Sequence, residues 1–309
     1  MKTQNKKTLS FLWVGIPILA LLFIFHNSMY PIKQSDLQSG FVLRDLNRFF
    51  TANGLNVILT QFEVRKLAHF IEYFIFGCLF TVTIQMIDKR QSGFLFPELF
   101  LFLAFPVADE TIQLYSPGRG SSVSDVLIDF VSCVVGLGLC HLICRRHVGK
   151  NDAVRSKPAF SAQGCTRRRI FTVITVLFIL FIFHNSMFPA PQSSAQSQYV
   201  MNLLNHTLAS FQIPILLSEH FVRKAGHFTE YFILGILMLI TVRSYRKPIW
   251  ESAFAGMFFL LLVPVIDEFI QLFAPKRGSS VLDVLLDFSG GMAGMVICWL
   301  IFRLREFRN

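Results

Sequence analysis

The sequence predicts an all-α, polytopic membrane protein built from two parallel-repeat units of four helices, with about eight transmembrane helices in total. Three observations predict this fold. Hydrophobic side chains make up 53% of the 309 residues and charged ones only 16%, and the mean hydropathy is +0.53, which is more apolar than an ordinary soluble domain. Apolar stretches of about 18 or more residues, long enough for a helix to cross a bilayer, recur along the chain. The second half also repeats the first without a gap.

The repeat has a constant offset of 158 residues. Phe-Ile-Phe-His-Asn-Ser-Met occurs at 23–29 and again at 181–187, and 16 of the 22 residues at 109–130 recur at 267–288. An in-register repeat of this length predicts two copies of one structural unit. We expect a four-span repeat over 1–145, a basic cytoplasmic linker over 146–169 and a second four-span repeat over 170–309.

Each repeat contains four apolar segments that can serve as membrane spans. They lie near 9–29, 66–87, 93–115 and 123–144, and near 170–188, 224–242, 249–272 and 281–302. With both termini in the cytoplasm, 19 of the 29 basic residues fall in cytoplasmic segments, as the positive-inside rule requires. The net charge of +10 therefore reflects orientation in the membrane, and we expect no nucleic-acid partner.

An even number of spans gives both repeats the same orientation. This arrangement differs from the inverted repeats of many ion-coupled transporters, which lowers the expectation of a lipid or drug translocator without removing it. The longer outer segments, 30–64 and 189–222, mix apolar residues with Asn, Gln and Ser. They are predicted to form short helices on the membrane surface. In the fourth span, Ser132 and Gly136, repeated as Gly290 and Gly294, predict close packing between helices.

Polar and charged residues gather at the predicted outer ends of the second, third and fourth spans. Arg65, His69 and Glu72 share one helical face because they lie four and three residues apart. Charged groups at membrane depth are costly and usually mark a functional site. The binding candidates of the first repeat are Arg65, His69, Glu72, Asp109, Glu110, Gln113, Arg119, Ser122, Asp125 and Asp129. Those of the second repeat are Arg223, His227, Glu230, Asp267, Glu268, Gln271, Arg277, Ser280, Asp283 and Asp287.

This set allows a purely structural interpretation and several functional ones. In the structural interpretation, Arg65 and Arg119 neutralise acids and hold the four helices together. However, five acids accompany three bases in each half, so we expect a hydrated cleft that opens to the outside. Arginines there suit phosphate, and carboxylates and amides suit sugar hydroxyls or amines.

A metal site and an enzyme are the chemical alternatives. His69 with Glu72 and nearby aspartates could hold a divalent ion. No cysteine cluster accompanies them, and His26 is the only other repeated histidine at hand, so we expect no metal and no cofactor. Whether a reaction is catalysed stays open. In an enzyme, the catalytic candidates for general base and proton shuttle are Glu72, His69 and Asp109, with Glu230, His227 and Asp267 in the second repeat.

The ordered motif resembles the VanZ-like family of bacterial membrane proteins. It reads Arg65-Lys-x-x-His69-Phe-x-Glu72-Tyr, then Asp109-Glu-x-x-Gln-x-x-x-Pro-x-Arg119-x-x-Ser-x-x-Asp-x-x-x-Asp, and both copies carry it. The resemblance implies a multi-pass protein of the bacterial cytoplasmic membrane that contributes to resistance to the glycopeptide teicoplanin. We expect the partners to be the lipid bilayer and either a lipid-linked cell-wall precursor or the drug.

Overall fold

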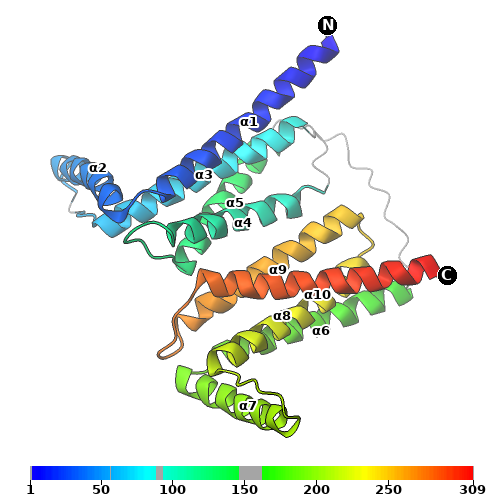
Figure 1. The fold of residues 1–309 in the computed structure, drawn as a ribbon. Coiled ribbons are helices and arrows are strands. Elements are labelled where there is room, and N and C mark those ends of the chain that lie inside the picture. Colours follow the sequence, from blue (N-terminus) through cyan, green and yellow to red (C-terminus); the bar gives the residue numbers. More distant parts are fainter. Residues whose placement is uncertain (1, 56, 88–92, 146–161, 309) are drawn as a thin grey trace. The chain divides into compact units, whose positions relative to one another are not determined.

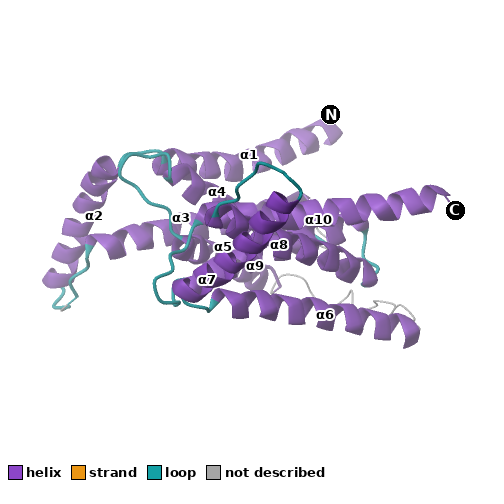
Figure 2. Cartoon of the chain, turned by 60° about the horizontal axis from the view of Figure 1, so that its bottom comes forward, coloured by secondary structure: helices purple, strands orange, loops and turns teal. Residues whose placement is uncertain are grey.

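The computed structural model describes residues 2–55, 57–87, 93–145 and 162–308. Every regular element in these ranges is an α-helix, and the described residues contain no strand (Figure 2). The chain divides into two compact units, Met1–Ser156 and Lys157–Asn309. Residues 146–161 of the predicted linker lie outside the described ranges. The structure therefore agrees with an all-α protein made of two repeated units.

The first unit contains five helices, and their order can be followed in Figure 1. They are α1 (Lys2–Ser28), α2 (Ile32–Ala52), α3 (Gln61–Ile87), α4 (Leu95–Gln113) and α5 (Val123–Arg145). The interior is apolar and aromatic, and Phe76, Phe102 and Cys133 are buried there with Ile24 of α1. Burial of such side chains contributes about 1.5–3 kcal/mol each in water; within a bilayer, tight packing takes over that role.

The second unit repeats this order 158 residues later. Its helices are α6 (Ala162–Ser186), α7 (Ala190–Ser210), α8 (Glu219–Ser244), α9 (Ile249–Gln271) and α10 (Val281–Arg308). Within this unit, α8 packs against α6, α9 and α10. In the first unit, α3 packs in the same way against α1 and α5. The repeat seen in the sequence is therefore a repeat of structure as well.

Six of the described helices are long and apolar enough to cross a membrane, which agrees with a polytopic membrane protein. They are α3, α5, α6, α8, α9 and α10. The number rises to seven if α1 and α2, which are bent by 110° at their junction, count as one span. Helix α4 falls outside the set because it carries Glu98, Asp109 and Glu110 within 19 residues. Two of these three acids, Asp109 and Glu110, belong to the predicted site.

The predicted surface segments form the helices α2 and α7. Each begins after a proline, Pro31 or Pro189, and contains no buried residue. Apolar side chains of α2, including Leu37, Phe41 and Val42, are exposed. Exposed apolar side chains on a largely polar helix are typical of helices that lie in the membrane interface. The position of α2 and α7 on the membrane surface stays a prediction.

The close packing predicted for the fourth span of each repeat is confirmed. A Cβ atom added to Gly136 of α5 would lie 2.8 Å from the carbonyl oxygen of Phe74 in α3. At Gly294 of α10 the corresponding distance, to the carbonyl oxygen of Phe232 in α8, is 2.0 Å. Only residues without a bulky side chain allow two helix backbones to approach this closely. This contact fixes the helix pair that carries the candidate site.

Candidate functional site

The predicted site residues converge at one end of each unit. In the first unit they come from the N-terminal ends of α3 and α5, from the C-terminal end of α4 and from the loop between α4 and α5. Helix α2 begins at the same end, because the backbone N–H of Ile32 donates a hydrogen bond to the carbonyl of Pro117 at 3.2 Å. Ala190 and Pro275 make the same bond in the second unit. The helix ends and the loop thus enclose one polar region per repeat.

A buried carboxamide connects the two acids at the end of α4. The Gln113 Nε2 atom donates to Asp109 Oδ2 at 3.2 Å and to Glu110 Oε1 at 3.0 Å. The other oxygen of Glu110 accepts a hydrogen bond from the backbone N–H of Ser122 at 2.7 Å. Glu110 therefore joins the end of α4 to the start of α5.

The second repeat reproduces this network. Gln271 Nε2 donates to Asp267 at 3.2 Å and to Glu268 at 2.8 Å, and the backbone N–H of Ser280 donates to Glu268 at 2.8 Å. Ser122 and Ser280 thus take part through their backbone. The recurrence shows that the motif encodes one defined arrangement.

A histidine and two aspartates form a second buried group. His69 Nδ1 lies 3.7 Å from Asp129 Oδ2, and one ligand-type atom each of His69, Asp109 and Asp129 lies within 4.8 Å of the others. Both aspartates are 0% exposed. Two ionised carboxylates this close repel each other by about 3 kcal/mol at an effective dielectric constant of about 20. The group therefore needs a proton or a cation to compensate its charge.

The same three residue types meet in the second repeat. His227 Nδ1 lies 3.7 Å from Asp287 Oδ2, and Asp267 completes a group within 4.8 Å. These two triplets are the residues with the chemistry to hold a metal ion. Sequence spacing alone did not select them, since each draws one residue from each of three helices.

Glu72, the acid on the helical face that also carries Arg65 and His69, is held by an asparagine. Asn27 Nδ2 donates to Glu72 Oε1 at 3.1 Å, and Asn185 donates to Glu230 at 3.2 Å. Because the amide occupies one carboxylate oxygen, the orientation of Glu72 is fixed between α1 and α3. Neither asparagine is among the predicted site residues. The signal that could have identified them is their place in the segment that recurs unchanged at 23–29 and 181–187.

Arg119 forms no ion pair with the acids among the described residues, whereas the structural interpretation of the motif expected it to neutralise them. Its guanidinium donates to the carbonyl of Ser28 at 3.1 Å and to the Ser35 hydroxyl at 2.8 Å. Among the described residues, no carboxylate lies within ion-pair distance of it. Burial lowers the pKa of Arg119, while the charge of Asp109 opposes that shift. Arg277 is held in the same way by Ser186 and Ser193.

The remaining bases pair with acids at the rim, and here the two repeats differ. Lys66 pairs with Asp125, and Lys224 pairs with Asp283 at 2.9 Å. Arg65 pairs with Asp36 of α2 at 3.1 Å. The residue corresponding to Asp36 in the second repeat is Ser194, and no ion pair of Arg223 occurs among the described residues.

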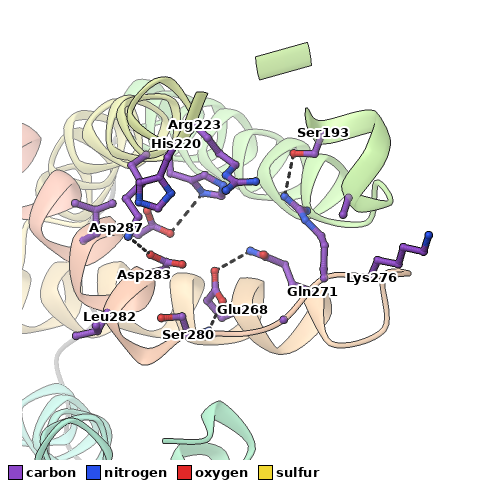
Figure 3. Close-up of a pocket in the computed structure, with 16 residues that line it drawn as sticks. Ser193, His220, Arg223, Glu268, Gln271, Lys276, Ser280, Leu282, Asp283 and Asp287 are labelled. Carbon is purple, nitrogen blue, oxygen red and sulfur yellow. Dashed lines mark hydrogen bonds and ion pairs between the residues drawn. The ribbon is translucent and has the colours of Figure 1, made fainter. Parts of the chain in front are cut away.

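Each unit has a cavity at this end. The first cleft, of about 410 Å³, lies between α2 and α3 and is lined by Arg65, His69, Glu72 and Arg119 together with apolar side chains. The second cleft, of about 290 Å³, is lined by predicted site residues of α8, α9, α10 and the loop between α9 and α10 (Figure 3). They are Arg223, His227, Glu268, Gln271, Arg277, Ser280, Asp283 and Asp287. Glu230 and Asp267 do not line it.

Comparison with known proteins identifies the family. The family model described as VanZ/LLP1 matches the chain twice, at residues 13–144 and 171–303. Comparisons with curated proteins and with solved structures gave no match. The two matches together cover most of the sequence and coincide with the two repeats, so the chain belongs to the VanZ/LLP1 family and carries two copies of its domain.

Proposed function

We propose that each repeat of this membrane protein binds the phosphate-bearing head group of a lipid-linked envelope precursor in its cleft. One observation carries the proposal: Arg119 and Arg277 line the clefts and have no carboxylate within ion-pair distance among the described residues. A guanidinium that is not already engaged in an ion pair is a strong ligand for phosphate oxygens. Its fixed position also lowers the entropy lost on binding.

The walls of the first cleft suit the rest of such a ligand. Gln38, Ser39 and Asn27 offer amide and hydroxyl groups, which match sugar hydroxyls or peptide amides. Val42 and Ile71 add apolar surface beside the charged end. This combination of a cationic end and an apolar wall fits a lipid whose head group meets its chain at the membrane surface.

Lys276 of the second cleft supports the same proposal. It occupies the position of Gly118 in the first repeat and has a φ of 60°. This left-handed conformation costs a residue other than glycine about 1–2 kcal/mol. Lys276 is one of the residues that line the second cleft, and Figure 3 shows its side chain extending outward from the cleft, so the strained position adds a positive charge at the edge of the cleft. Backbone strain of this kind is concentrated at functional sites.

The proposal is tested by measuring binding of a polyprenyl diphosphate to the full-length protein in detergent micelles. The polyprenol of the same chain length serves as the ligand control. We expect the diphosphate to bind more tightly, and the double variant Arg119→Gln with Arg277→Gln to weaken binding by about tenfold to a hundredfold, because a hydrogen bond to a charged group contributes about 1.5–3 kcal/mol. Arg44→Gln, which changes an exposed arginine of α2, is the matched control. Equal binding of diphosphate and alcohol would refute the proposal.

The resemblance to VanZ extends the proposal to glycopeptide resistance. A precursor held in the clefts is less available to teicoplanin, so expression of the chain in a sensitive bacterium is expected to raise the minimum inhibitory concentration. The double arginine variant, expressed to the same level in the membrane, should not. If both chains raise the inhibitory concentration equally, the clefts are not the source of resistance.

An enzyme that acts on the same lipid is the second candidate. The observation that favours it is the position of His69 and Glu72 in the first cleft, with Glu72 oriented by Asn27. A fixed carboxylate beside an imidazole can transfer protons during hydrolysis or group transfer. Mass spectrometry of envelope lipids from cells with and without the chain tests this candidate. A new or missing lipid species would support it, and identical lipid profiles would exclude it.

A further inference from the structure

We propose that a divalent metal ion binds between His69, Asp109 and Asp129, and that a second ion binds between His227, Asp267 and Asp287. The ligand atoms belong to three helices in each unit, with the histidine from α3 or α8 and the aspartates from α4 and α5 or from α9 and α10. This inference goes beyond the binding of a head group and does not depend on it.

The geometry of the three side chains matches a metal site better than a hydrogen-bonded triad. The distance of 3.7 Å between His69 Nδ1 and Asp129 Oδ2 is too long for a hydrogen bond. Two ligand atoms held about 2.1 Å from a tetrahedral ion lie about 3.4 Å apart, so small side-chain rotations would complete the coordination. The second repeat has the same 3.7 Å distance between His227 and Asp287.

Independent evidence comes from buried oxygen atoms that have no partner. Asp129 is 0% exposed, and neither of its carboxylate oxygens has a hydrogen-bond partner among the described residues. Oδ1 of Asp109 also has no hydrogen-bond partner among the described residues. The other oxygen of Asp109 accepts a hydrogen bond from Gln113. Asp287 and Oδ1 of Asp267 repeat the pattern. Buried polar atoms are nearly always satisfied, so unpartnered oxygens on residues whose ligand-type atoms lie within 4.8 Å of one another indicate a missing ligand.

The surrounding charges also favour a cation. Lys66 is paired with Asp125, and Arg65 is paired with Asp36. Arg119 donates to the Ser28 carbonyl instead of the aspartates. A divalent ion would supply the positive charge that these bases do not bring to the two carboxylates.

The ligand set indicates the class of metal. One imidazole nitrogen with carboxylate oxygens suits Zn²⁺ or Mn²⁺, whereas Mg²⁺ and Ca²⁺ prefer oxygen ligands alone. Gln113 supports Asp109 in the way that an outer hydrogen bond orients a metal ligand. Three protein ligands leave a coordination position for water or substrate. His69 lines the first cleft, and His227 and Asp287 line the second, so that position is within reach of the cleft.

The experiment measures the metal content of the full-length protein in detergent. The protein is first stripped with a chelator and then dialysed against Zn²⁺ or Mn²⁺, with Ca²⁺ as the comparison ion. We expect two ions per chain for Zn²⁺ or Mn²⁺, one for Asp129→Asn, and none for Asp129→Asn combined with Asp287→Asn. Asp45→Asn, a change at an exposed acid of α2, should leave two.

The duplication provides an internal control for folding, because the Asp129→Asn chain must still bind one ion at its intact second repeat. A spectroscopic measurement adds a signature that a structural role could not produce. With Mn²⁺ bound, electron spin-echo modulation from imidazole nitrogen should be present, and it should disappear in His69→Gln combined with His227→Gln. A wild-type chain that binds neither Zn²⁺ nor Mn²⁺, or a stoichiometry unchanged by the aspartate substitutions, overturns the proposal.

Discussion

Glu110 shows how single atoms define the site. One of its oxygens accepts from the side chain of Gln113, and the other accepts from the backbone of Ser122. Both bonds are almost free of solvent, because Glu110 is 1% exposed. A carboxylate can accept both bonds, whereas an amide presents one acceptor and one donor.

Glu110→Gln is therefore expected to destabilise the protein although its size is unchanged. The new NH₂ group must face a donor, so one buried hydrogen bond is lost, at a cost of about 1–3 kcal/mol. Thermal unfolding of the purified chain in detergent measures the effect, and Asp45→Asn is the exposed control. An unfolding midpoint equal to that of the wild type would contradict the assigned hydrogen bonds. Glu268→Gln should behave alike in the second repeat.

At the scale of helices, the pair α3 and α5 supports the site. His69 and Asp129 face each other only if the two backbones approach closely. Gly136 permits that approach, because a Cβ atom added there would lie only 2.8 Å from the carbonyl oxygen of Phe74. The position two residues later, Gly138, is exposed and has nothing within 4 Å of an added Cβ atom.

These two glycines of α5 give a matched pair of substitutions. Gly138→Ala is expected to be neutral or to stabilise by up to about 1 kcal/mol, since alanine favours the helix more than glycine does. Gly136→Ala gains the same propensity but forces the helices apart, so a net loss of about 1–3 kcal/mol is expected. Thermal unfolding of the two purified variants in detergent compares their stabilities. Similar midpoints for the two variants would show that α3 and α5 tolerate a wider separation.

The sequence predicted the residues of the motif but not their hydrogen bonds to residues far away along the chain. The positions of Asp109, Glu110 and Gln113 on one helix end follow from spacing of three and four residues. The bonds from Asn27 to Glu72 and from Arg119 to Ser28 join residues 45 and 91 positions apart. Such bonds depend on how helices pack in space, which periodicity does not specify. The helical class, the repeat and the close helix packing are confirmed, and the orientation of the termini stays a prediction.

For the whole molecule, the parallel repeat predicts that both clefts face the same side of the membrane. The loops after α4 and α9 can test this, because Tyr115 is 83% exposed and Phe273 is 76% exposed. We expect cysteines placed at Tyr115 and Phe273 to react with an impermeant maleimide added to intact cells.

A cysteine at Lys247, which lies between α8 and α9, should react only after the cells are permeabilised, because the expected orientation places that loop in the cytoplasm. The chain itself contains six cysteines, so the labelling of the unsubstituted chain is measured as the background. Labelling of only one of the two loop cysteines from outside would show that the repeats have opposite orientations.

Under the proposed function, the exchange of Asp36 for Ser194 predicts that the two clefts differ in affinity for an anionic ligand. Arg65 of the first cleft is paired with Asp36 at 3.1 Å, whereas no carboxylate lies within ion-pair distance of Arg223 among the described residues, and Glu219 interacts with it only at longer range. Two sites of unequal affinity on one polypeptide would fill one after the other as the ligand concentration rises. Saturation is then spread over a broader span of concentration than two identical receptors would cover.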